Sequence, residues 1–220
     1  MRDVLIALCP ALIAGCVVFG LRALLVVAVT TAACIFFEWG YEKLCGKPST
    51  ICDLSAAVTG VLLAMNLPVS IPLWQAVFGA LVAMVAVKGL FGGIGKNFAN
   101  PAITARIVMF LAFSKSMTAW VFPDAVSSAT PLAMMANGES VDYLTLLLCN
   151  HGGCLGETSA LALLIGFAYL LIRGVISWHT PVCFVGTVFV MSLILGQDAV
   201  GQILSGGLML GAIFMATDYS

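Results

Sequence analysis

The sequence predicts an all-α integral membrane protein, a polytopic helix bundle in a single membrane domain over residues 1–220. Of its 220 residues, 62% are hydrophobic and only 9% are charged, whereas about a quarter of the residues of soluble domains are charged. Apolar stretches alternate with short polar or glycine-rich breaks, and helices that cross a bilayer need about 20 apolar residues. The net charge of −1 gives no basic surface for nucleic acid.

About eight apolar stretches are candidate membrane spans. They cover residues 4–21, 23–37, 54–67, 71–90, 101–114, 159–173, 181–196 and 199–216. The spans 54–67 and 101–114 are short, so we expect them to line a site inside the protein. The segment 142–149 is too short to span, and we expect an interfacial or re-entrant turn there.

Several helix starts carry capping signals. Asn100 and Thr180 each precede a proline, which predicts a capped start with proline at the first helical position. Asp53 and Asp198 are the predicted caps of the third and eighth spans, and Thr158 or Ser159 is the predicted cap of the sixth.

The basic residues orient the chain. If the N-terminus is cytoplasmic, most Lys and Arg side chains fall on or near the cytoplasmic side: Arg2, Lys43, Lys47, Lys88, Lys96 and Arg173. Arg22 and Lys115 fall outside, so this arrangement agrees with the positive-inside rule. It predicts a multi-pass protein of the cell inner membrane with the loop 115–157 on the extracytoplasmic side.

That loop contains a segment of small polar residues, from Asp124 to Pro131. Thr130 precedes Pro131, which biases its backbone toward an extended conformation. Its neighbours Ser127, Ser128 and Ala129 are small. We therefore expect the Thr130 hydroxyl to be accessible to a second protein.

A glycine-rich segment, residues 89–101, leads into the fifth span. It has neither a dinucleotide-binding nor a P-loop pattern. Asn100 is either a helix cap or, with Asn97, a hydrogen-bonding partner for the ring edge of a cofactor, since an amide offers both a donor and an acceptor. Arg106 lies about 9 Å further along the helix. Ionisable groups inside spans are functional candidates, so we favour an interior position for Arg106 over one that reaches the membrane surface.

Four carboxylates are candidates for an ion pathway. Glu38 and Glu42 are four residues apart, so they share one helical face. Glu157 precedes the sixth span, and Asp218 follows the eighth. The alternative roles are a solvated helix end for the first pair and favourable charge at a helix start for Glu157. The cysteines, including Cys149 and Cys154 near His151, lack zinc-site spacing, so no metal site is predicted.

Several of these segments, in this order, resemble the D-subunit family of Rnf complexes, which are ion-translocating ferredoxin:NAD oxidoreductases. The B subunit of the sodium-translocating NADH:quinone reductase is related. The matching segments are 1–12, Asp53-Leu54-Ser55, Asn97-x-x-Asn100-Pro101-Ala102, Ser128-Ala129-Thr130-Pro131-Leu132, 156–159, 176–178 and 214–218. The loop segment is similar to the flavinylation signature Asp-x-x-Ser/Thr-x-Ala-Thr, with Ser128 where glycine is common.

The resemblance implies a fold of two inverted repeats similar to that of urea transporters. Members of the family are longer, so we expect the set of spans to be incomplete at the C-terminal end. The resemblance also implies FMN joined through its phosphate to Thr130, in the setting of Asp124, Ser127, Ser128, Ala129 and Pro131. It further implies a second, noncovalent flavin or riboflavin near Asn97, Asn100 and Arg106.

The implied function is electron relay coupled to Na⁺ or H⁺ transport, by a membrane subunit that is not catalytic alone. The implied partners are the other Rnf subunits, including a flavoprotein and iron–sulfur subunits, together with a flavin transferase and the lipid bilayer. Glu38, Glu42, Glu157 or Asp218 would link the redox state to cation movement. The alternatives are a permease or channel of urea-transporter-like fold without redox chemistry, and a purely structural component of the complex.

Overall fold

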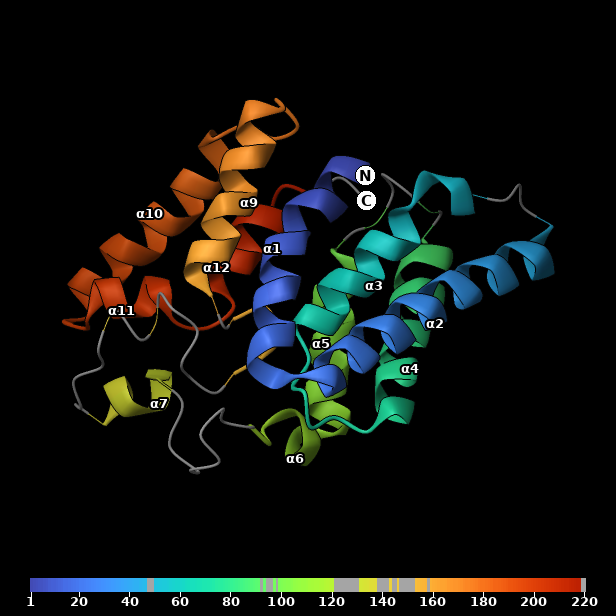
Figure 1. Ribbon diagram of the computed structural model, residues 1–220, viewed down its shortest axis with the longest axis horizontal. Helices are drawn as coiled ribbons and strands as arrows, with labels where there is room; N and C mark the ends of the chain where they lie inside the picture. The colour runs from blue at the N-terminus through green and yellow to red at the C-terminus, as the bar shows by residue number, and fades with distance from the viewer. Residues whose placement is uncertain are drawn as a thin grey trace. The chain divides into compact units, whose positions relative to one another are not determined.

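All regular secondary structure in the described residues is helical (Figure 1). The computed structural model describes residues 1–46, 50–91, 93, 97, 99–120, 131–137, 143, 146, 153–157 and 159–218. The chain divides into two units. Unit 1 contains Met1–Arg2, Leu21–Ala119 and Asp218–Ser220, and unit 2 contains Asp3–Gly20 and Trp120–Thr217.

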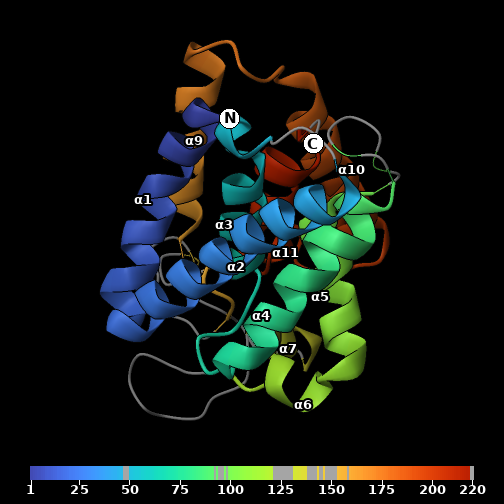
Figure 2. The ribbon, with the colours of Figure 1, turned by 90° about the vertical axis from the view of Figure 1, so that its right-hand side faces the viewer.

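Unit 1 is built around one long helix, α2, which runs along α3 and α4 (Figures 1 and 2). Its elements are α2 (Leu21–Cys45), the 3₁₀ turn η1 (Ile51–Asp53), α3 (Ser55–Met65), α4 (Leu73–Leu81), the π-helix η2 (Val82–Gly89), α5 (Pro101–Ala112) and α6 (Ser114–Met117).

The core of unit 1 is α3, in which every residue except Ala57 is buried. A helix that is apolar on all sides belongs inside a protein or a membrane. Gly60 brings it close to α2: a Cβ on Gly60 would lie 2.7 Å from the Cα of Thr31. Small residues at such a position let two membrane helices approach at backbone distance.

The helix α4 changes geometry where it becomes η2. Beyond Leu81 the backbone is π-helical, and the amide of Leu90 bonds to the carbonyl of Val85, five residues back, at 3.1 Å. The amide of Gly93 bonds in the same way to Lys88 at 3.0 Å. Short π segments inside α-helices are rare and often occur at functional sites.

Unit 2 contains the following helices: α1 (Arg2–Phe19, of which Arg2 is counted with unit 1), α7 (Pro131–Ala136), α9 (Ala160–Ile172), α10 (His179–Ile194), α11 (Ala199–Leu204), α12 (Leu208–Leu210) and the π-helix η3 (Gly211–Met215).

The helices α1 and α9 of unit 2 are antiparallel. Asp3, at the start of α1, accepts hydrogen bonds from the Tyr169 hydroxyl at 3.0 Å and from Arg173 Nε at 3.2 Å, near the end of α9. Further along, Gly166 lies against the carbonyl oxygen of Ala7, where a Cβ would collide. The hydrogen bonds of Asp3 at one end and the close contact of Gly166 in the middle therefore fix the register of α1 against α9.

The predicted spans agree with the helices in place and differ in extent. Within the described part of the chain, two helices, α1 and α2, are long and apolar enough to cross a membrane by length and composition, and the other apolar helices there are shorter. The second span continues to Cys45, well beyond the predicted end at residue 37. The eighth is interrupted, because Ser205 has an extended backbone between α11 and α12.

The capping predictions are confirmed at three helices and wrong at two. Asn100, Ser159 and Asp198 each accept hydrogen bonds from backbone amides of the helix that follows. The predicted Asp53 cap is wrong because Leu54 occupies the cap position, without a side-chain bond. The Thr180 cap is wrong because α10 already begins at His179 and includes Pro181 in its first turn.

The all-α fold class is thus confirmed for the described residues. The inverted-repeat arrangement stays a prediction. The segment 142–149 lies outside the described residues except for Tyr143 and Leu146.

Candidate ion and flavin sites

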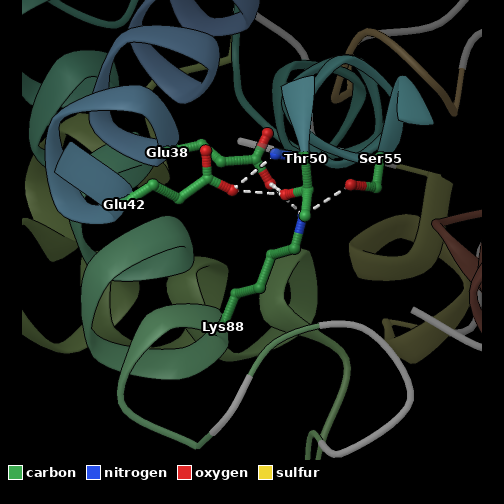
Figure 3. Close-up of polar contacts among 5 residues, drawn as sticks. All are labelled: Glu38, Glu42, Thr50, Ser55 and Lys88. Carbon is green, nitrogen blue, oxygen red and sulfur yellow. Dashed lines mark hydrogen bonds and ion pairs between the residues drawn. The ribbon is translucent and has the colours of Figure 1, made fainter. Parts of the chain in front are cut away.

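Five polar residues from four parts of unit 1 meet at the end of α2 (Figure 3). Glu38 and Glu42 come from successive turns of α2, and Lys88 comes from η2. Ser55 is the first residue of α3, and Thr50 precedes η1. We call this group the Glu38–Lys88 cluster.

The ammonium of Lys88 is the centre of the cluster. Its Nζ lies 2.5 Å from Glu38 Oε1 and 2.6 Å from the Ser55 hydroxyl oxygen. Thr50 binds the second carboxylate: its backbone amide donates to Glu42 Oε1 at 3.0 Å, and its hydroxyl donates to the same oxygen. The Thr50 hydroxyl also lies 3.5 Å from Glu38 Oε1, so Thr50 links the two carboxylates, while Lys88 binds Glu38.

The cluster is buried. Lys88 is 4% exposed, Glu38 5% and Glu42 7%. The Oε2 atoms of both glutamates are buried and receive no hydrogen bond. With all three groups ionised the cluster has a net charge of −1, and an uncompensated buried charge costs several kcal/mol. A proton or a small cation at the two Oε2 atoms would remove that imbalance.

Local backbone features place these side chains. Gly89 allows η2 to lie against Tyr41 of α2, since a Cβ there would be 3.0 Å from the ring. Leu54 has a left-handed backbone, with φ of 60°, which is uncommon for a residue other than glycine. It turns the chain immediately before Ser55. Strained residues of this kind concentrate at functional sites.

The pairing of Glu38 and Glu42 on one face was predicted from the sequence, and their burial fits an interior site better than a solvated helix end. Lys88 was assigned only to the cytoplasmic side, as one of the orienting charges. The sequence did contain a feature that indicates an interior role for Lys88, because this residue ends the apolar run Val82–Val87. An ionisable residue inside an apolar stretch needs a partner.

The predicted covalent flavin site lies outside the described residues, which exclude Asp124, Ser127, Ser128, Ala129 and Thr130. Pro131 is the first residue of α7, a position that its fixed φ suits.

The predicted second flavin site falls within unit 1. Arg106 is directed toward the interior, and its Nη1 donates to the Asn66 side-chain oxygen at 2.8 Å. Asn100 caps α5 through Oδ1, and its Nδ2 donates to Asp218 Oδ2 at 3.3 Å. Asp218 therefore lies beside Asn100, one of the residues predicted to bind the second flavin. The sequence did not predict this contact.

Asn97 stands out in this region. Both its Nδ2 and its Oδ1 are buried and form no hydrogen bond. Buried amides are almost always hydrogen-bonded, and the exceptions need an explanation. The donor and acceptor of Asn97 fit the ring edge of a flavin, which offers both complementary groups.

Glu157 belongs to unit 2. Its Oε2 accepts a hydrogen bond from the Cys154 amide at 3.3 Å. The start of α9 is capped by Ser159, whose hydroxyl accepts from the Ala162 amide at 3.2 Å. Glu157 thus closes the turn before α9.

Comparison with known proteins gives a consistent result. The sequence model of the NQR2, RnfD, RnfE family matches residues 1–220. The D subunit of the Na⁺-translocating ferredoxin:NAD⁺ oxidoreductase complex of Acetobacterium woodii is 45% identical over 228 residues, which is 100% of this chain and 72% of that protein. The D subunit of the proton-translocating complex of Clostridium ljungdahlii is 35% identical, over 99% of this chain and 73% of that protein.

The B subunit of the Na⁺-translocating NADH-quinone reductase of Azotobacter vinelandii is 36% identical over 73% of this chain and 45% of that protein. Together with the apolar helices, these matches identify a membrane protein and confirm the resemblance inferred from the sequence. The chain belongs to the NQR2, RnfD, RnfE family.

Proposed function

We propose that this chain is the membrane-embedded D subunit of an ion-translocating ferredoxin:NAD⁺ oxidoreductase complex, and that it carries FMN on Thr130. The observation that carries the proposal is the match of the whole chain to the D subunits of such complexes, at 45% and 35% identity. The chain takes part in a redox reaction of the assembled complex and is not catalytic alone. Its partners are the other subunits, including a flavoprotein and iron–sulfur subunits, and a flavin transferase for maturation.

The role of Thr130 is attachment. Its hydroxyl oxygen would attack the flavin-side phosphorus of FAD on the transferase, so that the P–O–P bond breaks, AMP and a proton leave, and FMN stays as a phosphoester of Thr130. The small neighbours Ser128 and Ala129 leave room for the transferase. A bound flavin supplies electron transfer, while the protein holds and orients it. A covalent tether keeps that cofactor in place through every turnover.

A second flavin, riboflavin or a related noncovalent form, is proposed beside Asn97, Asn100 and Arg106. The two unpartnered polar atoms of the buried Asn97 amide support this site. Arg106 positions the region by holding Asn66 at 2.8 Å.

Ion coupling is proposed at the Glu38–Lys88 cluster. Its carboxylates are buried and have two oxygens without a donor, and hard cations prefer oxygen ligands. If the N-terminus is cytoplasmic, the cluster lies toward the cytoplasmic end of α2. Glu157 and Asp218 have polar partners of their own, which support structural roles for them.

The test is to express the full complex with its flavin transferase in wild-type form and with Thr130→Ala. After denaturation in SDS, we expect in-gel flavin fluorescence from the wild-type chain and none from the variant. Peptide mass spectrometry across Thr130 should locate the FMN. Ferredoxin-to-NAD⁺ electron transfer should collapse in the variant while the complex still assembles.

Thr145→Ala is the matched control, since it removes a threonine hydroxyl from the same loop outside the motif. It should keep both fluorescence and activity. An unmodified wild-type peptide, from cells that flavinylate a control protein, would contradict the proposal and favour a permease without redox chemistry. Full electron transfer in Thr130→Ala would instead indicate a purely structural role.

A further inference from the structure

Lys88 places a positive charge among oxygen atoms of the kind that bind a small cation. Its ammonium lies 2.5 Å from Glu38 Oε1, inside a cluster with two carboxylates and two hydroxyl groups. Such oxygens are the ligands of a small monovalent cation as well as the acceptors of an ammonium. The lysine and a mobile cation therefore compete for the negative charge of the same carboxylate, that of Glu38.

Electrostatics makes this competition strong. Glu38, Glu42 and Lys88 are each less than a tenth exposed, so water screens their charges weakly. The net charge of −1 favours one added cation. Among the described residues the ammonium has two acceptors, Glu38 and Ser55, although it has three donors to satisfy. The ammonium is therefore bound through two of its three donors, which favours its release.

The backbone that carries Lys88 is π-helical, which sets the direction of its side chain. Lys88 lies in the π-helix η2, which continues the α-helical segment α4. Each residue turns through a smaller angle in a π-helix than in an α-helix. A change of η2 toward α-helical geometry would therefore rotate Lys88 about the helix axis and away from Glu38. The π-helical geometry of η2 therefore holds the Lys88 ammonium against Glu38, where it competes with a cation for that carboxylate.

We propose that the Lys88 ammonium is a tethered cation, which binds Glu38 when the site is unloaded and leaves it when a transported Na⁺ or H⁺ binds Glu38 and Glu42. The inference rests on the proposed ion-coupled function and assigns a residue to it. Lys88 sets the affinity for the cation and prevents the carboxylates from retaining it.

The test uses the intact complex, with FMN on Thr130 verified by fluorescence. We would measure the Na⁺ concentration that gives half-maximal ferredoxin:NAD⁺ reductase activity at fixed pH. Lys88→Gln should lower that concentration at least tenfold, because the tethered competitor is lost. Lys88→Arg keeps the charge and should change it less than threefold.

Lys43→Gln is the matched control. Lys43 lies on the same helix as Glu38 and Glu42, but it is exposed and sits 4.9 Å from the Trp39 ring centroid. Removal of its charge should leave the half-saturating Na⁺ concentration unchanged. An equal shift in both glutamine variants would indicate a general charge effect and would overturn the proposal.

A second comparison covers the case in which Lys88→Gln fails to assemble. Glu38→Gln removes the carboxylate that Lys88 binds and leaves Glu42 as the one carboxylate of the cluster, so it should raise the half-saturating Na⁺ concentration at least tenfold. Addition of Lys88→Gln to it should reverse most of that rise, because the buried ammonium then no longer repels a cation at Glu42. A double variant no better than Glu38→Gln would overturn the proposal.

If activity does not depend on Na⁺, the cation measured is the proton, and the pH of half-maximal activity replaces the Na⁺ concentration. Lys88→Gln should then raise that pH by at least one unit. Other titratable groups near Lys88 are Cys34 and Tyr41 of α2, while Cys52 and Asp53 of η1 are exposed. If Lys88→Gln shifts neither the half-saturating Na⁺ concentration nor the pH of half-maximal activity, the inference is overturned. If the wild-type complex carries no FMN or has no ferredoxin:NAD⁺ reductase activity, the proposed function is refuted instead.

Discussion

Glu38 and Lys88 are 50 residues apart in the sequence, and their charged groups meet at 2.5 Å in the buried interior of unit 1. Such a pair contributes little net stability, because desolvation of the charges offsets their attraction. Loss of one partner alone is costly. The pair is therefore better explained by a function that needs a movable charge than by stabilisation of the fold.

The close approach of α2 and α3, which brings Ser55 to this pair, depends on Gly60. In Gly60→Ala the new Cβ would be forced to 2.7 Å from the backbone of Thr31. We expect destabilisation by about 1–3 kcal/mol, the usual cost of overpacking. Thermal unfolding of the detergent-solubilised complex would show it as a lower melting temperature.

Gly40→Ala is the matched control for this prediction. Gly40 also lies in α2, but a Cβ there meets nothing within 4 Å. Replacement of an unconstrained helical glycine by alanine stabilises by about 0.5–1 kcal/mol. Equal effects of the two variants would show that the contact between the helices is not tight.

The sequence predicted most of the helices because their signal is local. Apolar length and caps such as Asn100 and Asp198 depend on neighbouring residues alone, and the structure confirms them. Two caps were mispredicted because other residues took those positions. Leu54 adopts a left-handed backbone after Asp53, and α10 includes the residues before Pro181.

The candidate site was predicted only in part, because it depends on long-range packing. The shared face of Glu38 and Glu42 follows from their spacing within one helix. The contact of Glu38 with Lys88 depends on the π geometry of η2 and on Gly89, and neither has a clear sequence pattern. For the same reason the bond between Asn100 and Asp218, 118 residues apart, was not predicted.

Leu54 offers a test of backbone strain beside the cluster. Its φ of 60° costs about 1–2 kcal/mol for a residue with a Cβ. Leu54→Gly removes that cost but adds about 0.5–1 kcal/mol of entropy loss on folding. We therefore expect a change in stability of less than about 1 kcal/mol, measured by thermal unfolding of the complex.

Leu54→Val is the informative partner of that variant. A β-branched side chain is the least compatible with a positive φ, so this variant should melt below both Leu54→Gly and the wild type. If Leu54→Gly melted lower than Leu54→Val, the packing of the leucine side chain would be the dominant factor instead of the backbone.

Asn97 provides the sharpest test of a second flavin. Its buried amide forms no hydrogen bond, and an unsatisfied buried polar group costs about 1–3 kcal/mol. Without a ligand, Asn97→Ala should therefore stabilise the protein. With a flavin bound, the same change removes hydrogen bonds to the cofactor, so the noncovalent flavin released by denaturation of the purified complex should fall at least fivefold. FMN on Thr130 should be unchanged in SDS gels.

Asn137→Ala is the matched control. Asn137 lies in an exposed turn after α7, and its replacement should alter neither the amount of noncovalent flavin nor the melting temperature. Noncovalent flavin at the wild-type level, together with a higher melting temperature for Asn97→Ala, would show that this amide is an unsatisfied core group and that any second flavin binds elsewhere.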